Sequence, residues 1–241
     1  MKVTVLSSGS KGNSTLVETD NLNILIDTGL PLSNLEKRLE RTFPHIDVLV
    51  ITHSHIDHIK GINSVIKKFN PIVFTHSPAV IEKYDKNINK ENEIILNGIS
   101  ISLFPLSHDV PCTGVSIKDL DKELIYITDT GYINKKVLNK ILNKDMYIIE
   151  SNHNVEMLRH GKYPFFLQQR ILGDSGHLSN EDTVKYLNQV VGNKTKHIIL
   201  AHLSEENNSI EKVSEALKQL TPNVNKPIIA KQEKSLETIE V

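Results

Sequence analysis

The sequence predicts an α/β fold in which two mixed β-sheets pack face to face and helices cover their outer faces. Predicted strands occur in two batches along the 241 residues, and helices follow each batch. No linker, repeat or shift in composition divides the chain. Because two sheets can bury one face against each other and the other face against helices, the pattern favours a single domain over residues 1–241.

The composition is that of an ordinary globular protein, with 39% hydrophobic and 24% charged residues. The net charge is −1 with the 11 histidines neutral. Bulk charge therefore does not attract nucleic acid, and such a partner would have to meet a local basic patch. A lone cysteine, Cys112, excludes an intrachain disulfide. No leader and no long apolar run is recognisable, which predicts a cytoplasmic protein without a membrane span. Nothing in the sequence indicates an oligomeric state.

The first batch of strands contains one hairpin and is followed by helices. The joint Asp20-Asn21 predicts that the strands on either side of it pair antiparallel. Ser33, with Glu36 three residues later, predicts a capped helix through Arg41. Apolar residues at helical spacing predict one helix over 57–68. Strands are expected over 3–6, 15–18, 23–27, 48–51 and 72–75, with a short helix over 78–85.

Within the second batch of strands, turn signals at Asn97-Gly98 and Leu120-Asp121 separate neighbouring strands. Residues 154–189 are expected to be mostly helical, with interruptions at Gly173 and Gly176. Strands are expected over 93–96, 99–104, 115–117, 124–128, 146–149 and 197–200, helices over 134–143 and 209–220, and edge strands at 228–229 and 238–239.

The densest chemistry lies directly after the apolar run 48–51, at the C-terminal end of a buried strand. Three imidazoles and a carboxylate fall within six positions there: His53, His55, Asp57 and His58. Imidazole and carboxylate together suit zinc, manganese or iron. A polar loop that is merely rich in histidine is the alternative, but chance rarely places four ligand-type residues in this spacing after a strand. The sequence therefore predicts a metal site.

Other predicted strands also end in ligand-type residues. His108, Asp129 and His202 each follow a strand, and Glu150 and His153 follow another. A single residue of this kind is usually a cap or a turn residue. Several of them downstream of a dense ligand loop favour a shared site.

This series of residues resembles the five motifs of the metallo-β-lactamase superfamily, over residues 3–202. The resemblance implies an αββα sandwich with two divalent metal ions (zinc or manganese, or else iron) at the C-terminal ends of strands. It implies seven metal ligands: His53, His55 and His108 for the first ion, Asp57, His58 and His202 for the second, and Asp129 as the bridge. Asp27 matches the aspartate of the first motif and would orient a ligand, although a turn aspartate before Gly29 is the alternative.

Three further stretches are similar to the WalJ (YycJ, VicX) branch of that superfamily, whose members are described as nuclease-like and cytoplasmic. They are residues 8–14, 150–153 and 176–180, and two shorter pieces, 157–159 and 161–164, match as well. The resemblance implies a metal-dependent phosphodiesterase that acts on DNA as a 5′→3′ exonuclease, with a hydroxide bridging two metals as the attacking group. Asp57, Asp129 and His153 would carry the catalysis. A hydrolase of a small phosphodiester or a thioester, and a metal-stabilised regulatory module linked to a signalling system, stay open as alternatives.

Substrate contacts are expected close to these ligands. His153 could contact a phosphate oxygen or the leaving oxygen, or it could be a structural histidine bonded to backbone. Ser179 can cap a helix that begins at Asn180, and a helix N-terminus there would bind phosphate together with His177. The loop over 7–14, which includes Asn13, could offer backbone amides to a nucleotide, although it could equally be only the approach to a hairpin.

Basic residues cluster at Lys60, Lys67 and Lys68, and again in residues 159–170, where the cluster lies beside three aromatic residues, Tyr163, Phe165 and Phe166. These aromatic rings could stack on nucleic-acid bases. Aromatic residues in a helix more often lie in the core, so both interpretations stay open at this point.

Overall fold

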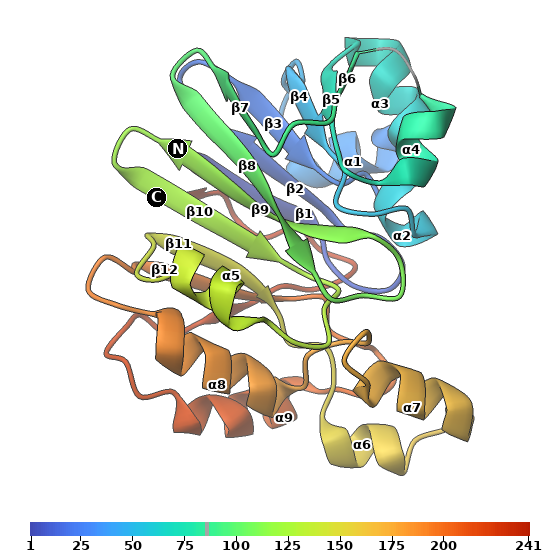
Figure 1. Cartoon of the computed structure of the whole chain (residues 1–241), viewed down its shortest axis with the longest axis vertical. Coiled ribbons are helices and arrows are strands. Elements are labelled where there is room, and N and C mark those ends of the chain that lie inside the picture. Colours follow the sequence, from blue (N-terminus) through green and yellow to red (C-terminus); the bar gives the residue numbers. More distant parts are fainter. Residues whose placement is uncertain (85–86) are drawn as a thin grey trace.

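The computed structural model describes residues 1–84 and 87–241. Within these residues the chain forms two mixed sheets, each of seven strands, packed face to face with helices on the outer sides (Figure 1). The predicted fold class is confirmed. In the part of the chain that is described, no helix is long and apolar enough to cross a membrane.

The first sheet has the strand order β14-β1-β2-β3-β4-β5-β6. Neighbours from β14 to β3 pair antiparallel, whereas those from β3 to β6 pair parallel. The predicted hairpin is confirmed, because Glu18 in β2 pairs with Asn23 in β3. The strands of this sheet are β1 (Lys2–Ser7), β2 (Ser14–Glu18), β3 (Asn23–Ile26), β4 (Val48–Val50), β5 (Ile72–Phe74), β6 (Ile88–Asn89) and β14 (Ile239–Glu240).

The second sheet has the order β13-β12-β11-β10-β9-β8-β7 and repeats the same plan. Neighbours from β7 to β10 pair antiparallel, and those from β10 to β13 pair parallel. The strand predicted over 115–117 is longer, because the pairing with β8 runs from Cys112 to Asp119. The strands are β7 (Glu93–Leu96), β8 (Ile99–Leu106), β9 (Cys112–Asp119), β10 (Lys122–Ile127), β11 (Met146–Glu150), β12 (His197–Ala201) and β13 (Ile228–Ile229).

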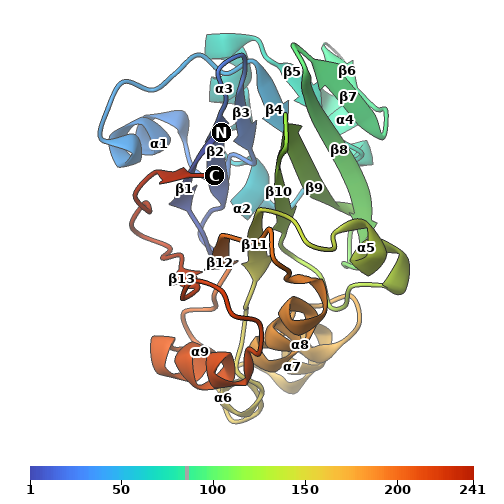
Figure 2. The ribbon, with the colours of Figure 1, turned by 90° about the vertical axis from the view of Figure 1, so that its left-hand side faces the viewer.

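Helices follow the strands of each half. Figure 2 shows α1 on the side of the first sheet, and α8 and α9 together on the side of the second. The first half contains α1 (Leu32–Leu39), α2 (Ile56–Ile59), α3 (Ile62–Phe69) and α4 (Pro78–Lys83). The second half contains α5 (Lys135–Lys140), α6 (Val155–Arg159), α7 (Phe165–Leu172), α8 (Asn180–Val190) and α9 (Ile210–Ala216), which a 3-10 turn (Leu217–Gln219) continues.

Three apolar clusters hold these layers together, one between the sheets and one under the helices of each half. Alternate residues of a strand point to opposite faces of the sheet, so each central strand contributes side chains to two of the clusters. In β4, Val48 and Val50 face the central cluster and Leu49 faces the helices. In β11, Ile148 faces the centre and Tyr147 the outer cluster. Burial on both faces explains why these strands read as continuous apolar runs.

The capping box predicted for α1 is wrong. The helix begins at Leu32 with Pro31 at the N-cap and no side-chain cap. Proline holds the backbone at a φ that suits the start of a helix, so Ser33 falls inside the first turn. Glu36 forms an ion pair with Lys68 of α3 instead.

The single helix predicted over 57–68 is also wrong, since the chain forms α2 and α3 with a break at Lys60-Gly61. The Gly61 amide donates to the Thr28 carbonyl at 2.7 Å. A Cβ atom at Gly61 would lie 2.1 Å from the carbonyl oxygen of Leu30. The helix therefore breaks where the loop after β3 passes against it. The end of the helix predicted over 78–85 lies outside the described residues.

Candidate metal centre

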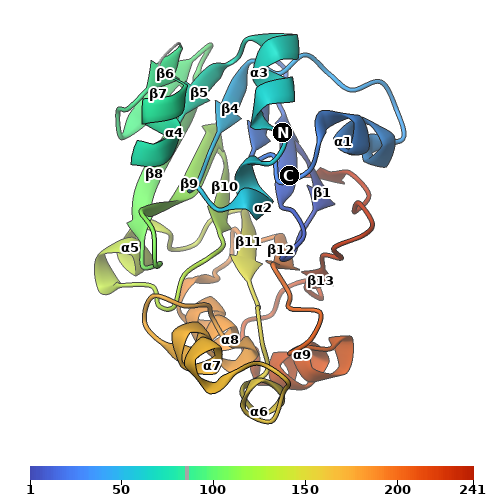
Figure 3. The ribbon, with the colours of Figure 1, turned by 90° about the vertical axis from the view of Figure 1, so that its right-hand side faces the viewer.

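The ligand-type residues predicted from the sequence gather at one edge of the sandwich, where strands of both sheets end. Asp27 follows β3, the ligand loop follows β4, and His108 follows β8. Asp129 follows β10 and His202 follows β12. Figure 3 shows α2, which carries part of the ligand loop, close to β11 and β12, with α6 and α7 beyond them. Strand ends from both halves therefore meet around one pocket.

The first cluster consists of His53, His55 and His108, whose ligand atoms lie within 4.8 Å of one another. The Nδ1 atom of His55 is 3.1 Å from Nε2 of His53 and 3.3 Å from Nε2 of His108. The opposite ring nitrogens have partners. Nδ1 of His53 lies 3.0 Å from the hydroxyl of Thr52, and Nδ1 of His108 donates to the Gly176 carbonyl at 3.3 Å. These contacts leave one nitrogen of each ring for the cluster centre.

The second cluster consists of Asp57, His58 and His202. Oδ2 of Asp57 lies 3.5 Å from Nε2 of His58 and 3.6 Å from Nε2 of His202. Each of these histidines is held from behind by a buried carboxylate. Nδ1 of His58 is 2.7 Å from Asp27, and Nδ1 of His202 is 2.7 Å from Glu150. A carboxylate in this position fixes the tautomer and orients Nε2 towards a metal.

Asp129 lies between the two clusters and is buried. Its Oδ2 atom is 3.2 Å from Nε2 of His58, yet within residues 1–84 and 87–241 this atom accepts no hydrogen bond. Among the described residues, Nε2 of His202 is likewise buried without a hydrogen-bond partner. A buried polar atom without a partner is destabilising, and a cation placed between these atoms would remove that penalty. The residues therefore fit a divalent metal ion.

The electrostatics of the site follow from its burial. Burial lowers the pKa of His53 to about 2, so this imidazole is neutral. For His202, burial opposes the charge, but Asp129 and other carboxylates raise its pKa to about 10. Burial alone would raise the pKa of Asp129, yet His202 and His58 hold it well below its usual value. The carboxylate of Asp129 is thus ionised although it is buried among imidazoles. A metal ion bound there can compensate its negative charge.

Three residues of the site have a left-handed backbone, with φ of 57° at Asp27, 60° at Asp129 and 54° at His202. Asp27 and His202 are the first residues after β3 and β12, and Asp129 is the second residue after β10. This conformation is uncommon outside glycine, and it persists where the surrounding structure over-determines it, frequently at functional sites. The left-handed conformation thus occurs where the chain leaves a strand and places a side chain in or behind the site.

Glu150, the last residue of β11, has a role that the sequence did not reveal. It is completely buried. One carboxylate oxygen accepts from His177 and from His202, both at 2.7 Å, and the other accepts from the backbone amides of Thr130 and Leu178. The sequence showed only that Glu150 is a ligand-type residue at the end of a predicted strand. Its contact with two histidines arises from the pairing of strands, which the sequence does not show. Burial would raise its pKa, and His177 and His202 lower it to about 2.

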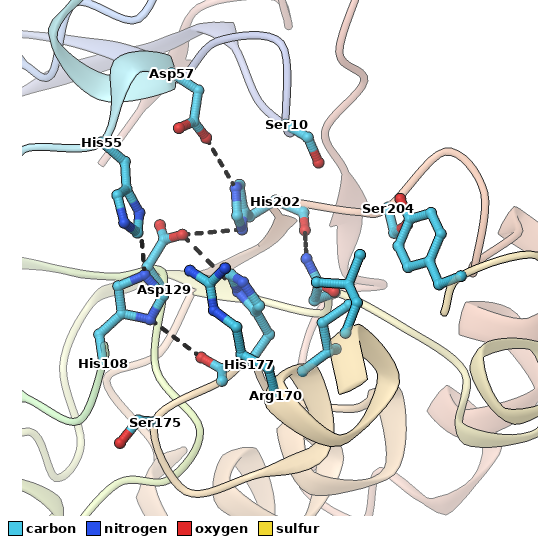
Figure 4. A pocket seen from close by; sticks show the side chains of 15 residues that line it. Ser10, His55, Asp57, His108, Asp129, Arg170, Ser175, His177, His202 and Ser204 are labelled. Carbon is cyan, nitrogen blue, oxygen red and sulfur yellow. Dashed lines mark hydrogen bonds and ion pairs between the residues drawn. The ribbon is translucent and has the colours of Figure 1, made fainter. Parts of the chain in front are cut away.

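The pocket in front of the clusters is closed on its other side by α7 and the loops next to it. Tyr163, Leu167 and Arg170 line that wall, and Figure 4 shows Arg170 there together with the ligand-type residues. Arg170 forms an ion pair with Asp109, whose other carboxylate oxygen lies 3.2 Å from Nε2 of His108. Neither residue of this pair was predicted as part of the site, because α7 meets the loop after β8 only in the folded chain.

Of the predicted substrate contacts, His177 lines the pocket, as does Ser10 of the loop over 7–14. His153 is buried away from it, and neither ring nitrogen has a hydrogen-bond partner among the described residues. Ser179 caps α8, where its hydroxyl accepts from the Asp182 amide at 3.0 Å. Asn13 lies behind the ligand loop, with Nδ2 3.0 Å from Nε2 of His58. Substrate contact by His153, Ser179 or Asn13 therefore stays a prediction.

Comparison with known proteins agrees with this geometry. The family model described as "Beta-lactamase superfamily domain" matches residues 22–203. The chain is 38% identical over 224 residues to exodeoxyribonuclease WalJ of Streptococcus pneumoniae, covering 86% of this chain and 83% of that one. It is 35% identical over 221 residues to exodeoxyribonuclease YycJ of Bacillus anthracis, covering 86% and 84%. The fold resembles that of the metallo-beta-lactamase fold protein YhfI of Bacillus subtilis, with a TM-score of 0.72, 18% identity and coverage of 98% and 99%.

Proposed function

The chain belongs to the beta-lactamase superfamily and, within it, to the family of WalJ and YycJ, and on this basis we propose that it is an exodeoxyribonuclease. It is a metal-dependent hydrolase, and the bond that it cleaves is a phosphodiester. The observation that carries the proposal is the complete set of seven ligand-type residues, drawn from both halves and gathered at one pocket, which five of them line while His53 and His58 lie buried behind it. We propose residues 1–241 as one catalytic domain, since each cluster needs both sheets. The 5′→3′ direction and a cytoplasmic location are proposed from the family resemblance.

We propose two metal ions, zinc or manganese, with iron as the further alternative. His53, His55 and His108 would hold one ion, Asp57, His58 and His202 the other, and Asp129 would contact both. When bound, the ions would polarise a phosphoryl oxygen and lower the pKa of the attacking water. The inward-facing ligand atoms support this assignment, because each residue already points one nitrogen or oxygen at the centre of its cluster.

The other side chains of the pocket would position the substrate. Glu150 binds Nδ1 of His177, which leaves Nε2 of that ring as the atom available to a phosphate oxygen or to the leaving oxygen. The guanidinium of Arg170 lies on the pocket wall and could pair with a non-bridging phosphate oxygen, since guanidinium groups match phosphate geometry. Glu150 thus orients a substrate contact as well as the ligand His202.

The test is DNA hydrolysis by the purified protein loaded with manganese or zinc, with strands labelled at either end. We expect mononucleotides to be released from the 5′ end, and Asp129→Asn to reduce the rate at least about 10³-fold. Asp121→Asn, which changes an exposed turn residue, is the matched control and should be without effect. Unchanged cleavage by Asp129→Asn would reject the assignment. Hydrolysis of bis(p-nitrophenyl) phosphate without any cleavage of DNA would favour the small-phosphodiester alternative.

A further inference from the structure

Carboxylates lie beside three of the ligand histidines, and one of these carboxylates differs from the other two. Asp27 and Glu150 hold the histidines of the second cluster and are completely buried. Asp109, in the loop after β8, lies beside His55 of the first cluster, and its side chain is 27% exposed. The first cluster therefore has a carboxylate that is open to the surface and to contacts with other parts of the chain.

The ring of His55 needs a defined tautomer to bind a metal. Its Nδ1 atom faces the first cluster, 3.1 Å from His53 and 3.3 Å from His108. A neutral imidazole carries one proton, so Nδ1 can bind a metal only when the proton is on Nε2. Oδ1 of Asp109 lies 3.4 Å from Nε2 of His55, and a carboxylate there favours this tautomer.

The same oxygen of Asp109 lies 3.2 Å from Nε2 of His108. Nevertheless, in the part of the chain that is described, Asp109 belongs to none of the groups whose ligand atoms all lie within 4.8 Å of one another. The geometry therefore places Asp109 beside the ligands of the first cluster and not among them.

The other oxygen of Asp109 is bound by α7, a helix that has no fully buried side chain. Phe165 and Phe166 are each 74% exposed, so the interpretation of these aromatic residues as part of the core is wrong. Figures 1 and 3 show α6 and α7 projecting from the body of the second half. Among residues 1–84 and 87–241, the pair of Arg170 with Asp109 is the one ion pair that joins α7 to another part of the chain. Because apolar burial holds α7 weakly, this polar contact has a large share in fixing its position.

Arg170 is also available to a ligand in the pocket. Its side chain is 55% exposed and lines the pocket together with His55 and His108 (Figure 4). One terminal nitrogen binds Asp109, whereas a guanidinium has five N–H donors. The same side chain can therefore bind the carboxylate beside His55 and a phosphate oxygen at the same time.

We propose that Asp109 and Arg170 act as a positioning pair for the first metal ion. Asp109 holds the tautomer of His55 that turns Nδ1 towards the metal, and Arg170 holds Asp109 in place from α7. A phosphate bound by the remaining N–H groups of Arg170 is thereby placed relative to the first metal. The statement about phosphate rests on the proposed function, whereas the effect on metal binding does not.

The direct test is the affinity of each of the two metal ions, measured by competition with a chelating dye. We expect Asp109→Ala to weaken one ion about tenfold and to leave the other unchanged, because loss of a residue that orients a ligand histidine has an effect of this size. Arg170→Gln should weaken the same ion about threefold, and Arg170→Lys should recover most of this loss, since one charged nitrogen is enough to pair with Asp109. The matched controls are Asp174→Asn, at an exposed carboxylate just after α7, and Arg159→Gln, on the surface of α6, and both should be without effect. All variants should fold, because partly exposed ion pairs contribute little to stability.

The double variant Asp109→Ala/Arg170→Gln distinguishes a pair from two independent residues. Residues that act through each other lose no more together than the larger single loss, so we expect the double variant to weaken the ion about tenfold. A loss of about thirtyfold, the product of the two single effects, would overturn the pairing.

NMR spectra that correlate ring protons with ring nitrogens report the tautomer of His55 directly. In the metal-free protein, at a pH where this ring is neutral, Asp109→Ala should shift the proton from Nε2 towards Nδ1. A tautomer that does not change in this variant would overturn the role of Asp109. Elemental analysis that finds one metal per chain instead of two would make Asp109 a ligand, which also overturns the positioning role.

The affinity of the metal-loaded protein for a phosphorothioate DNA strand, which resists hydrolysis, tests the contact with phosphate. Arg170→Gln should weaken this binding about tenfold, as expected for the loss of a charge-assisted hydrogen bond. Unchanged DNA affinity would overturn the contact between Arg170 and phosphate. Since metal affinity and the His55 tautomer are measured without DNA, the expected changes in a protein that cleaves no DNA would support the positioning pair and reject the nuclease.

Discussion

The two halves of the sandwich share one plan of strands but supply the candidate metal centre in opposite ways. The first half places four ligand-type residues on the single loop after β4, whereas the second half supplies single residues after β8, β10 and β12. Each cluster takes two residues from the loop and one histidine from the second half. Neither half can complete either of these two clusters alone, so metal binding at them requires both halves.

The halves also differ in how they hold these residues. Backbone contacts fix the loop of the first half: Asn13 N donates to Asp57 O, and Thr28 N donates to His58 O, both at 2.8 Å. Gly29 permits this, because a Cβ atom there would lie 1.8 Å from the Asp57 carbonyl oxygen. In the second half a single side chain, Glu150, contacts two histidines and two loop amides. The second half is therefore more vulnerable to one substitution.

The strongest test of the comparison removes one ligand from each half. His53→Ala and His108→Ala should each cost one metal ion per chain and reduce DNA hydrolysis at least about 10³-fold, since both belong to the same cluster. Elemental analysis of the purified variants and a nuclease assay measure the two effects. His45→Ala, at an exposed histidine outside the clusters, should change neither. Retention of both ions by His108→Ala would contradict the idea that both halves are required.

The next test contrasts the buried histidines of the two halves. His58 has partners at both ring nitrogens, whereas His153 has none among the described residues. Burial lowers the pKa of His153 to about 4. The folded state therefore disfavours the protonated ring, and protonation stabilises the unfolded chain below about pH 6.5. Above that pH this effect is absent. As the pH falls from about 6.5 to 4, the free energy of unfolding should decrease by about 3 kcal/mol on account of His153.

His153→Gln removes this titration, so its stability relative to the unmodified protein should rise by that amount over the same range of pH. Urea unfolding at several pH values measures the difference, and other titrating groups cancel in the comparison. His160→Gln, at an exposed histidine of α6, is the control. A difference between His153→Gln and the unmodified protein that stays constant with pH would show that His153 is protonated or partnered in the folded chain.

The smallest expected effect concerns the carboxylates behind the ligands. Asp27→Asn and Glu150→Gln should each lower metal affinity or activity about 10- to 100-fold, because such carboxylates orient the ligand histidines. We expect the larger loss for Glu150→Gln, which disturbs His177 as well as His202. Competition with a chelating dye and steady-state hydrolysis measure the two quantities. Glu215→Gln, on the surface of α9, should have no effect. A larger loss for Asp27→Asn than for Glu150→Gln would contradict the view that the second half is more vulnerable to one substitution.

Sequence reasoning was most successful where information is local. The apolar runs of β4 and β11 predicted central strands correctly. A strand that is buried on both faces consists almost entirely of apolar residues, so its sequence alone reveals it. The loop from His53 to His58 identified the site by its density of ligand-type residues. Local rules failed at α1, where Pro31 rather than Ser33 starts the helix, and at Gly61, where a distant loop breaks the helix.

The parts that were missed depend on contacts between distant segments. Glu150 meets His202 because β11 and β12 lie side by side, with Glu150 paired to Ala201. Arg170 reaches Asp109 across 61 positions of the chain. No spacing rule relates such residues, so their place in the site could be found only in the folded chain. For His153 and Ser179 the sequence predicted more than the structure shows. Their neighbours in sequence, Asn152 and His177, line the pocket, whereas their own side chains are buried outside it.

The left-handed backbone at Asp27, Asp129 and His202 also limits how the centre can change its choice of metal. Glycine, asparagine, aspartate and histidine adopt this conformation more readily than other residues, and a β-branched residue is poorly tolerated there. Redesign towards a softer, thiolate-rich centre should therefore begin at His53, His55 or His108, which do not have a positive φ. The backbone of this chain thus leaves His53, His55 and His108 open to exchange, while it restricts Asp129 and His202 to residues that tolerate a positive φ.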